Sequence, residues 1–391
     1  MITRRRLVQS LVAFGASPSG VARALEGRRN EKTLVVVFLR GGVDGLSMVP
    51  PVGDPAYAAL RPTLKLSTKG SGAALPLDGA FALHPALAPL LPRFQAKELA
   101  VVHATGLPNA PRSHFEAQDF LESGTPGRRA PDGWLNRAGA GLSGAFSMVA
   151  IQNGMPSSMA GDGQALAFPS LKDFKVGGGA ATTFEALYAQ AVDDALRTSG
   201  REAFESLSTA QRDGLASRTP ENGAVYPRGV LGRRLQDIAR LVHADVGLSL
   251  AATELGGFDT HLAQGAATGQ LATRLDEVGQ ALAAFAQDLG PKLADVTLLT
   301  MTEFGRTARE NGTRGTDHGA ASVSLVLGGG VQGGRVVADW PSLSSGALFE
   351  GRDLKTTTDL RSVMSECLES VGLRRAQVFP DFTPAKLGLF G

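Results

Sequence analysis

Residues 33–45 read TLVVVFLRGGVDG, a run of β-branched and apolar residues that ends in a glycine-rich loop carrying Asp44. A continuous apolar run indicates a strand that is buried on both faces, as in a parallel sheet. In such sheets the loops beyond the carboxyl ends of the strands form the binding crevice. The stretch therefore predicts a central strand at residues 33–39 of an α/β domain, with Asp44 at the edge of the sheet where a site would form.

Similar apolar runs and amphipathic stretches follow along the chain. Between residues 268 and 289, apolar side chains recur every three or four positions, which is typical of a helix with one buried face. The alternation of strands and helices predicts right-handed crossovers and a three-layer α/β/α sandwich with a mostly parallel central sheet. Strands are predicted at 99–103, 248–254, 296–302 and 322–327, and helices at 113–121, 232–242, 268–289 and 362–371.

The middle of the chain, residues 125–245, gives weaker signals. Glycine-rich loops alternate there with amphipathic segments such as 183–198 and 232–242. This region is either an inserted subdomain or an elaborated part of the same layers, and the sequence leaves both alternatives open.

The N-terminus, residues 1–24, has a basic start with arginines at positions 4–6, a short apolar stretch and an Ala22-Arg23-Ala24 site. These are the parts of an export signal, and the tandem arginines resemble the twin-arginine type that exports folded proteins. The alternative is a basic amphipathic helix. The signal predicts the twin-arginine export machinery as a partner, a periplasmic or extracellular location, and no transmembrane segment in the mature chain.

The charge balance narrows the classes of partner. The chain has 39 basic and 37 acidic side chains and a formal net charge of +2. Such a balance gives no long-range field that would attract nucleic acid, so we expect no nucleic-acid partner.

Ionisable residues recur where the predicted strands end. Carboxylate oxygens and imidazole nitrogens together suit a divalent ion such as zinc, manganese or calcium, and two such ions can clamp an oxyanion substrate. Any one acidic residue in a glycine-rich loop is more often a turn former or helix cap. Six such groups in four loops nevertheless favour a centre of one or two ions: Asp44, Asp259, His261, Glu303, Asp317 and His318.

Five stretches of this sequence, RGGVDGLS, PRSHFEAQDFLESG, GGFDTH, TEFGRT and GTDHG, resemble those of a family of exported bacterial proteins of unknown function. That family is related to the sulfatases within the alkaline phosphatase superfamily. The resemblance covers nearly the whole mature chain and implies that residues 31–391 form an alkaline-phosphatase-like α/β domain.

The superfamily pattern implies roles for particular residues. Asp44 matches a metal-binding aspartate after the first strand, and Ser113 is the nearest counterpart of the nucleophile at a helix start. Ser113 is otherwise an ordinary N-cap, with His114 as the functional neighbour. Asp259 and His261 match a further Asp and His, and His318 matches the last histidine.

One position departs from that pattern. Glu303 and Phe304 stand where an Asp-His pair is expected, and phenylalanine cannot bind a metal. The missing ligand must then come from Asp317, His114 or water, while Glu303 either holds a second ion weakly or orients the first ligands. Arg306 and Arg112 are candidates for fork-like contacts to a sulfate or phosphate group, against the alternative of ordinary surface arginines.

Two functions follow from these residues. The first is a metal-dependent hydrolase of phosphate or sulfate esters, small molecules or glycans, outside the cytoplasm. The second is a non-catalytic exported protein that keeps the fold and binds glycan or another partner, which the loss of a ligand at Phe304 favours.

Overall fold

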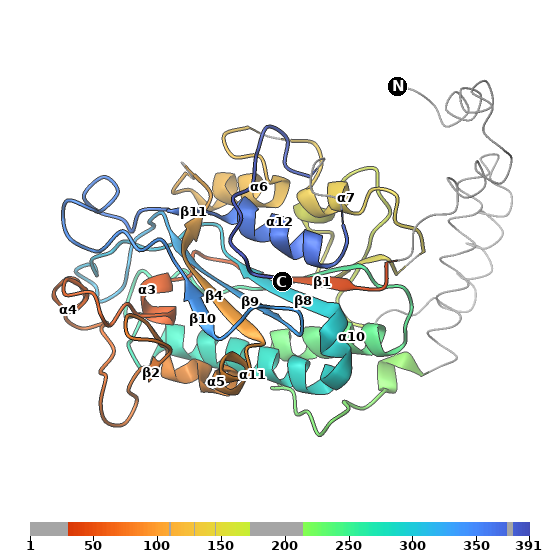
Figure 1. Cartoon of the computed structure of the whole chain (residues 1–391), viewed down its shortest axis with the longest axis horizontal. Coiled ribbons are helices and arrows are strands. Elements are labelled where there is room, and N and C mark those ends of the chain that lie inside the picture. The colour runs from red at the N-terminus through yellow and green to blue at the C-terminus, as the bar shows by residue number, and fades with distance from the viewer. Residues whose placement is uncertain (1–29, 109–110, 129, 145, 173–213, 374–377) are drawn as a thin grey trace, which may run out of the picture.

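A computed structural model describes residues 30–108, 111–128, 130–144, 146–172, 214–373 and 378–391. The predicted export signal and the amphipathic segment 183–198 lie outside these residues. Within them, nine strands form one sheet in the order β10-β4-β9-β8-β1-β7-β5-β6, and β11 pairs with β4 (Figure 1). The strands are β1 (Thr33–Leu39), β4 (Leu99–Gly106), β5 (Met148–Ile151), β6 (Leu166–Phe168), β7 (Leu250–Leu255), β8 (Val296–Met301), β9 (Ser322–Gly328), β10 (Arg335–Val337) and β11 (Thr358–Asp359).

The sheet is mostly parallel, as predicted. In the part of the chain that the structure describes, β9 is the one strand of this sheet that runs antiparallel to its neighbours, β8 and β4. Strand β1 pairs in parallel with β7 on one side and β8 on the other. The carboxyl ends of β1, β4, β7 and β8 and the amino end of β9 therefore lie at the same edge.

Strand β1 explains why its sequence is apolar without alternation. Val35, Val37 and Leu39 pack into one hydrophobic core, whereas the intervening Leu34, Val36 and Phe38 pack into a second core on the opposite face. Full burial of a side chain of this size contributes about 1.5–3 kcal/mol. Both faces of the strand thus contribute to stability.

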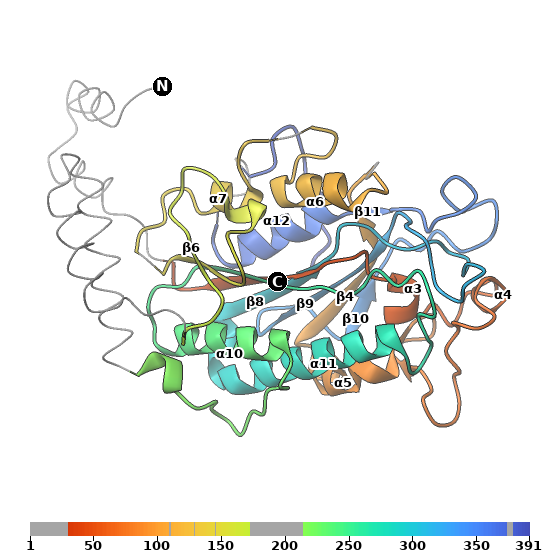
Figure 2. The ribbon, with the colours of Figure 1, turned by 180° about the vertical axis from the view of Figure 1, so that it is seen from behind.

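Helices cover the two faces of the sheet (Figures 1 and 2). Helices α10 and α11 lie on one face with η1 and α5, and α6, α7 and α12 lie on the other. The predicted three-layer α/β/α sandwich is therefore confirmed. The bounds are η1 (Pro85–Leu90), α5 (Leu91–Gln95), α6 (His114–Ser123), α7 (Trp134–Ala138), α10 (Val230–His243), α11 (Gln270–Leu289) and α12 (Leu360–Ser370).

The described part of residues 125–245 belongs to these layers. Strands β5 and β6 extend the main sheet beside β7, and Leu231 and Leu235 of α10 join the same core as Leu275 of α11. Shorter elements are α3 (Gly45–Met48), α4 (Tyr57–Leu60), β2 (Leu75–Pro76), β3 (Ala82–Leu83), η2 (Ser157–Met159), η3 (Leu215–Ser217) and η4 (Gly290–Asp295).

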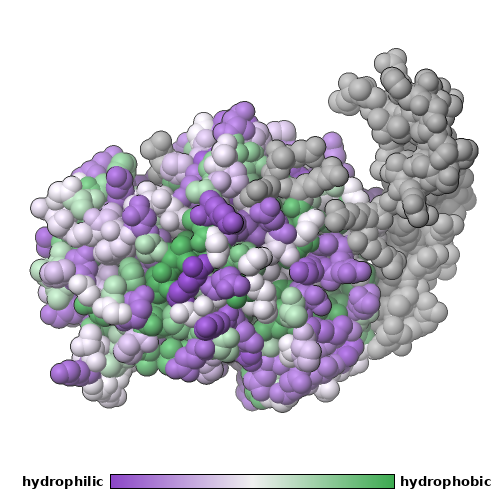
Figure 3. All heavy atoms as spheres, in the orientation of Figure 1, coloured by the Kyte–Doolittle hydropathy of each residue, from purple (hydrophilic) through white to green (hydrophobic). Residues whose placement is uncertain are grey.

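No helix among the described residues could span a membrane. None of their helices combines the length and the apolar character needed to cross a bilayer. Hydrophilic and hydrophobic residues are interspersed on the face shown in Figure 3.

Candidate metal centre

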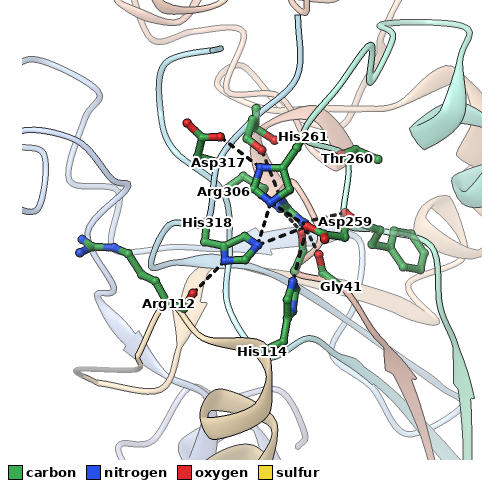
Figure 4. A network of polar contacts seen from close by, with 12 residues as sticks. Gly41, Arg112, His114, Asp259, Thr260, His261, Arg306, Asp317 and His318 are labelled. Atoms are coloured by element: carbon green, nitrogen blue, oxygen red, sulfur yellow. Dashed lines mark hydrogen bonds and ion pairs between the residues drawn. The ribbon is translucent and has the colours of Figure 1, made fainter. Parts of the chain in front are cut away.

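Four side chains from three loops converge at the edge where the strands end (Figure 4). Asp259 and His261 follow β7, His318 precedes β9, and His114 is the first residue of α6. Their distances from one another are short. His261 Nε2 lies 3.0 Å from Asp259 Oδ1 and 2.9 Å from His318 Nε2. Asp259 Oδ1 also lies 3.2 Å from His318 Nε2 and 3.5 Å from His114 Nε2.

Each of the three imidazoles is oriented through its other ring nitrogen. His114 Nδ1 contacts Glu303 Oε1 at 2.8 Å, His261 Nδ1 contacts Asp317 Oδ1 at 3.1 Å, and His318 Nδ1 contacts the Arg112 carbonyl oxygen at 2.8 Å. A carbonyl or an ionised carboxylate only accepts hydrogen bonds, so each Nδ1 donates. In the neutral imidazole each Nε2 is then left with a lone pair that faces Asp259.

This arrangement fits a bound cation. A metal-ligating histidine almost always donates its second ring N–H to a carboxylate or backbone carbonyl. Ligands that share a tetrahedral zinc ion at about 2.0–2.1 Å lie about 3.3 Å apart, close to the separations found here. The Nε2 atom of His114 is buried and has no hydrogen-bond partner among the described residues. His114, Asp259 and His318 thus offer three ligand atoms within 4.8 Å of one another.

The electrostatics of the centre keep its carboxylates ionised. Burial acts to raise the pKa of Asp259, but the hydrogen bond and charge of Arg306 outweigh it and lower that pKa to about 2. The hydrogen bond to Glu303 raises the pKa of His114. The pKa of Glu303 is lowered despite its burial, because His114, Gln118 and the Gly41 amide donate to it. Both carboxylates are therefore acceptors at neutral pH.

Over residues 31–384 the sequence matches the family described as a protein of unknown function, DUF1501. The chain belongs to the DUF1501 family. A comparison with curated proteins finds no match.

Solved structures with a related arrangement are similar to this DUF1501 chain only at low sequence identity. The C-terminal periplasmic domain of EcEptC from Escherichia coli, solved as a complex with Zn, is 11% identical with a TM-score of 0.39, over 93% of this chain and 90% of that chain. The PsFucS1 sulfatase from Pseudoalteromonas sp. is 13% identical with a TM-score of 0.42, over 96% of this chain and 76% of that chain. The phosphonate monoester hydrolase of Agrobacterium radiobacter is 12% identical with a TM-score of 0.32, over 88% and 74%.

Glu303 and Asp317 lie behind the DUF1501 cluster and face the distal nitrogens of its histidines. The Glu303 carboxylate is fully buried, and its Oε1 also accepts hydrogen bonds from Gly41 N and Gln118 Nε2, both at 2.9 Å. Asp317 Oδ1 accepts a further hydrogen bond from Asn311 Nδ2 at 3.1 Å. Of the two roles expected for Glu303, this geometry matches the orienting one.

Phe304, which stands where the resemblance places a histidine, is buried between two candidate ligands. Its ring centroid lies 4.9 Å from that of His114 and 4.6 Å from that of His318. His114 Nε2 from α6, 3.5 Å from Asp259 Oδ1, is the candidate for the nitrogen that Phe304 cannot supply, and it is one of the sources that the sequence left open.

Arg306 does not have the place expected for a contact to an external anion. Its side chain is fully buried. Nε donates to the Gly42 carbonyl at 2.6 Å, Nη1 to the Thr316 carbonyl at 3.0 Å, and Nη2 to Asp259 Oδ1 at 2.7 Å. Because acceptors from three loops hold the guanidinium, Arg306 fixes those loops and leaves no fork for a substrate.

Arg112 is likewise engaged within the protein. Its Nη2 donates to Asp353 Oδ2 and Glu350 Oε2, both at 2.6 Å, and its carbonyl oxygen orients His318. Arg112 therefore acts on the cluster through its backbone.

Asp44 lies outside the four-residue cluster, although the sequence groups it with the ligands. It is fully buried, and its Oδ2 accepts hydrogen bonds from Arg61 Nη1, Ser47 Oγ and Gln264 Nε2. Arg61 gives no signal in the sequence, because it stands in no recognisable motif. Gln264 could have been found through its closeness to the GGFDTH stretch.

Ser113 has the position that the sequence predicts for it. It is the N-cap of α6, its backbone is extended, and its side chain makes no capping hydrogen bond. Ser113 is exposed and stands directly before His114. The hydroxyl is therefore not committed to the helix that follows it.

Proposed function

We propose that this chain is a metal-dependent hydrolase of phosphate or sulfate esters that acts outside the cytoplasm after export by the twin-arginine route. The observation that carries the proposal is the convergence of three oriented imidazole Nε2 atoms on Asp259 Oδ1. With neutral imidazoles whose Nδ1 atoms carry the proton, these four atoms are all electron-pair donors and would repel one another unless a cation lay between them. Three imidazoles and one carboxylate favour zinc or manganese over calcium, which prefers oxygen ligands.

The residues at the centre would have different roles in the proposed reaction. When bound, the ion would act as a Lewis acid that withdraws charge from an ester oxygen. His114, Asp259, His261 and His318 would hold it, while Glu303 and Asp317 keep the imidazoles in the required orientation. Arg306 keeps Asp259 ionised.

Ser113 would be the nucleophile. Its hydroxyl is exposed and uncommitted, and it precedes the amino end of the ten-residue helix α6. The unpaired amides and partial positive charge of a helix N-terminus favour a phosphate or sulfate group there. The adjacent His114 would bring the ion and the nucleophile to the same substrate.

The test compares two variants in the mature protein. The His261→Ala/His318→Ala double variant should lose bound metal by elemental analysis and lose turnover of arylphosphates and arylsulfates. Ser113→Ala should lose turnover but retain the metal, because its side chain contacts none of the proposed ligands. Circular dichroism and thermal unfolding serve as controls to check that both variants fold. Full turnover in the double variant would refute the proposed hydrolase.

A non-catalytic binding function is the second candidate, and the surface around the cluster favours it. Phe115 is 86% exposed beside His114, and Leu262 is 63% exposed beside His261. Exposed apolar side chains at a site are typical of partner or ligand surfaces. Two results would support this second function. Wild type would contain metal but turn over neither arylphosphates nor arylsulfates, and Ser113→Ala would bind glycan as well as wild type does.

A further inference from the structure

Asp44 and Arg61 form an ion pair that is closed off from solvent. Both side chains are buried, at 1% and 0% exposure, and Arg61 Nη1 lies 2.5 Å from Asp44 Oδ2. Arg61 outweighs the effect of burial and lowers the pKa of Asp44, which keeps that carboxylate charged. A buried carboxylate requires a cation beside it, and here the chain supplies its own.

The surroundings of the Arg61 guanidinium are oxygen atoms. Nε donates to the Ala308 carbonyl at 3.0 Å, Nη2 to the Thr307 carbonyl at 2.9 Å, and Nη1 to Ser47 Oγ at 3.0 Å. The Oδ1 atom of Asp44 is also buried and has no partner among the described residues. Carboxylate, hydroxyl and carbonyl oxygens are the donor set of a hard divalent cation.

This pair is connected to the loops that carry the proposed ligands. Gln264 Nε2 donates to Asp44 Oδ2 at 2.7 Å, and Gln264 Oε1 accepts hydrogen bonds from Thr260 Oγ1 and Thr316 Oγ1, both at 2.8 Å. Thr260 stands between Asp259 and His261, and Thr316 stands two residues before His318. Gln264 therefore links the Asp44–Arg61 pair by hydrogen bonds to the two loops that carry the proposed ligands.

We propose that the Arg61 guanidinium is a resident cation, which occupies the place where Asp44 would otherwise bind a second metal ion. The inference rests on the proposed function, whose metal centre it limits to one ion. The second ion that the superfamily resemblance implies at Asp44 does not fit, because Asp44 Oδ2, Ser47 Oγ and the carbonyls of Thr307 and Ala308 all accept hydrogen bonds from the guanidinium. Arg61 thus holds Asp44 in position and supplies the positive charge that a metal ion would otherwise supply.

The experiment counts ions in matched variants of the mature protein. Arg61→Ala removes the guanidinium and leaves its oxygen surroundings with an unpaired carboxylate. After equilibration with calcium and gel filtration, elemental analysis should find one more ion per chain in Arg61→Ala than in wild type. Calcium should also raise the Tm of this variant more than that of wild type. The double variant Asp44→Asn/Arg61→Ala lacks the carboxylate and should gain neither the ion nor the Tm shift.

The outcomes separate this inference from the proposed function. Equal ion counts in Arg61→Ala and wild type, or an equal gain in the double variant, would overturn the inference. If wild type contains no ion, the proposed hydrolase function is refuted. A gain of one ion in Arg61→Ala would still support the inference in that case. If Arg61→Ala does not fold even with calcium, anomalous diffraction from manganese-soaked wild-type crystals decides. An intact Asp44–Arg61 pair without a manganese peak supports the inference, and a peak bonded to Asp44 overturns it.

Discussion

Replacing Glu303 by glutamine separates the charge behind His114 from the shape of the site. The Oε1 atom of Glu303 accepts hydrogen bonds from His114 Nδ1 at 2.8 Å and from Gly41 N and Gln118 Nε2 at 2.9 Å. A glutamine amide oxygen can take the same place and keep these three donors satisfied. The substitution therefore removes the negative charge and leaves the hydrogen-bond geometry available.

The expected magnitude follows from the hydrogen bonds that lose their charge. Hydrogen bonds to a charged group contribute about 1.5–3 kcal/mol each, against about 0.5–1.5 kcal/mol for neutral pairs. The raised pKa of His114 derives first from Glu303, so Glu303→Gln should lower that pKa and make Nε2 a weaker ligand. Loss of such an outer partner typically reduces metal affinity by about 10–100-fold, equivalent to about 1.4–2.7 kcal/mol.

Competition with a chromogenic zinc chelator at neutral pH measures this change directly. Glu366→Gln is the matched control, since Glu366 accepts hydrogen bonds from the amides of Leu387, Gly388 and Leu389 and takes no part in the cluster. Zinc affinity should fall in Glu303→Gln and remain at the wild-type value in Glu366→Gln. Unchanged affinity in Glu303→Gln, or an equal fall in the control, would refute the orienting role.

Two further predictions concern stability. Burial lowers the pKa of His103 from 6.5 to about 4, and its Nδ1 accepts the Ala104 N–H, so only the unfolded chain takes up this proton between those values. The free energy of unfolding should therefore fall by about 3 kcal/mol as pH drops from 6.5 to 4. In urea titrations, His103→Gln should not show this fall. If the free energy of unfolding of the variant depends on pH as that of wild type does, His103 is not its source. A Cβ at Gly305 would lie 1.7 Å from the Ala321 carbonyl oxygen, so thermal scans of Gly305→Ala should show a loss of about 2–3 kcal/mol. Gly256→Ala, whose Cβ meets nothing within 4 Å, is the control and should stay within about 0.5 kcal/mol; similar losses in both would contradict the steric argument.

The fold could be predicted where elements are long and strongly patterned. The strand predicted at 33–39 has the bounds of β1, and the helix predicted at 268–289 corresponds to α11. Strands β5, β6 and β10 have only three or four residues, too few to show a period, so no strand is predicted there from the sequence. The antiparallel direction of β9 also has no local signal, because a strand buried on both faces has the same pattern in either direction.

The candidate site could be predicted as a set of loops but not as a set of contacts. Asp259, His261 and His318 come together because the loop that leaves β7 and the loop that enters β9 lie at the same edge of the sheet. The orientation of Asp44 and Arg306 depended on partners that the sequence does not connect with them. Asp44 pairs with Arg61, and the Arg306 guanidinium is held by backbone carbonyls that no side-chain pattern reveals.

In the proposed centre, His114 supplies the nitrogen that Phe304 lacks. His114 at the start of α6 places Nε2 3.5 Å from Asp259 Oδ1, and its ring packs against Phe304. Glu303, one residue before Phe304, then orients the very imidazole that replaces the missing one. Because the aromatic ring and the carboxylate both contact His114, the departure from the superfamily pattern at 303–304 supports a ligand on α6. The same two positions that argue against a two-ion centre thus provide the packing and the hydrogen bond for the one-ion centre that we propose.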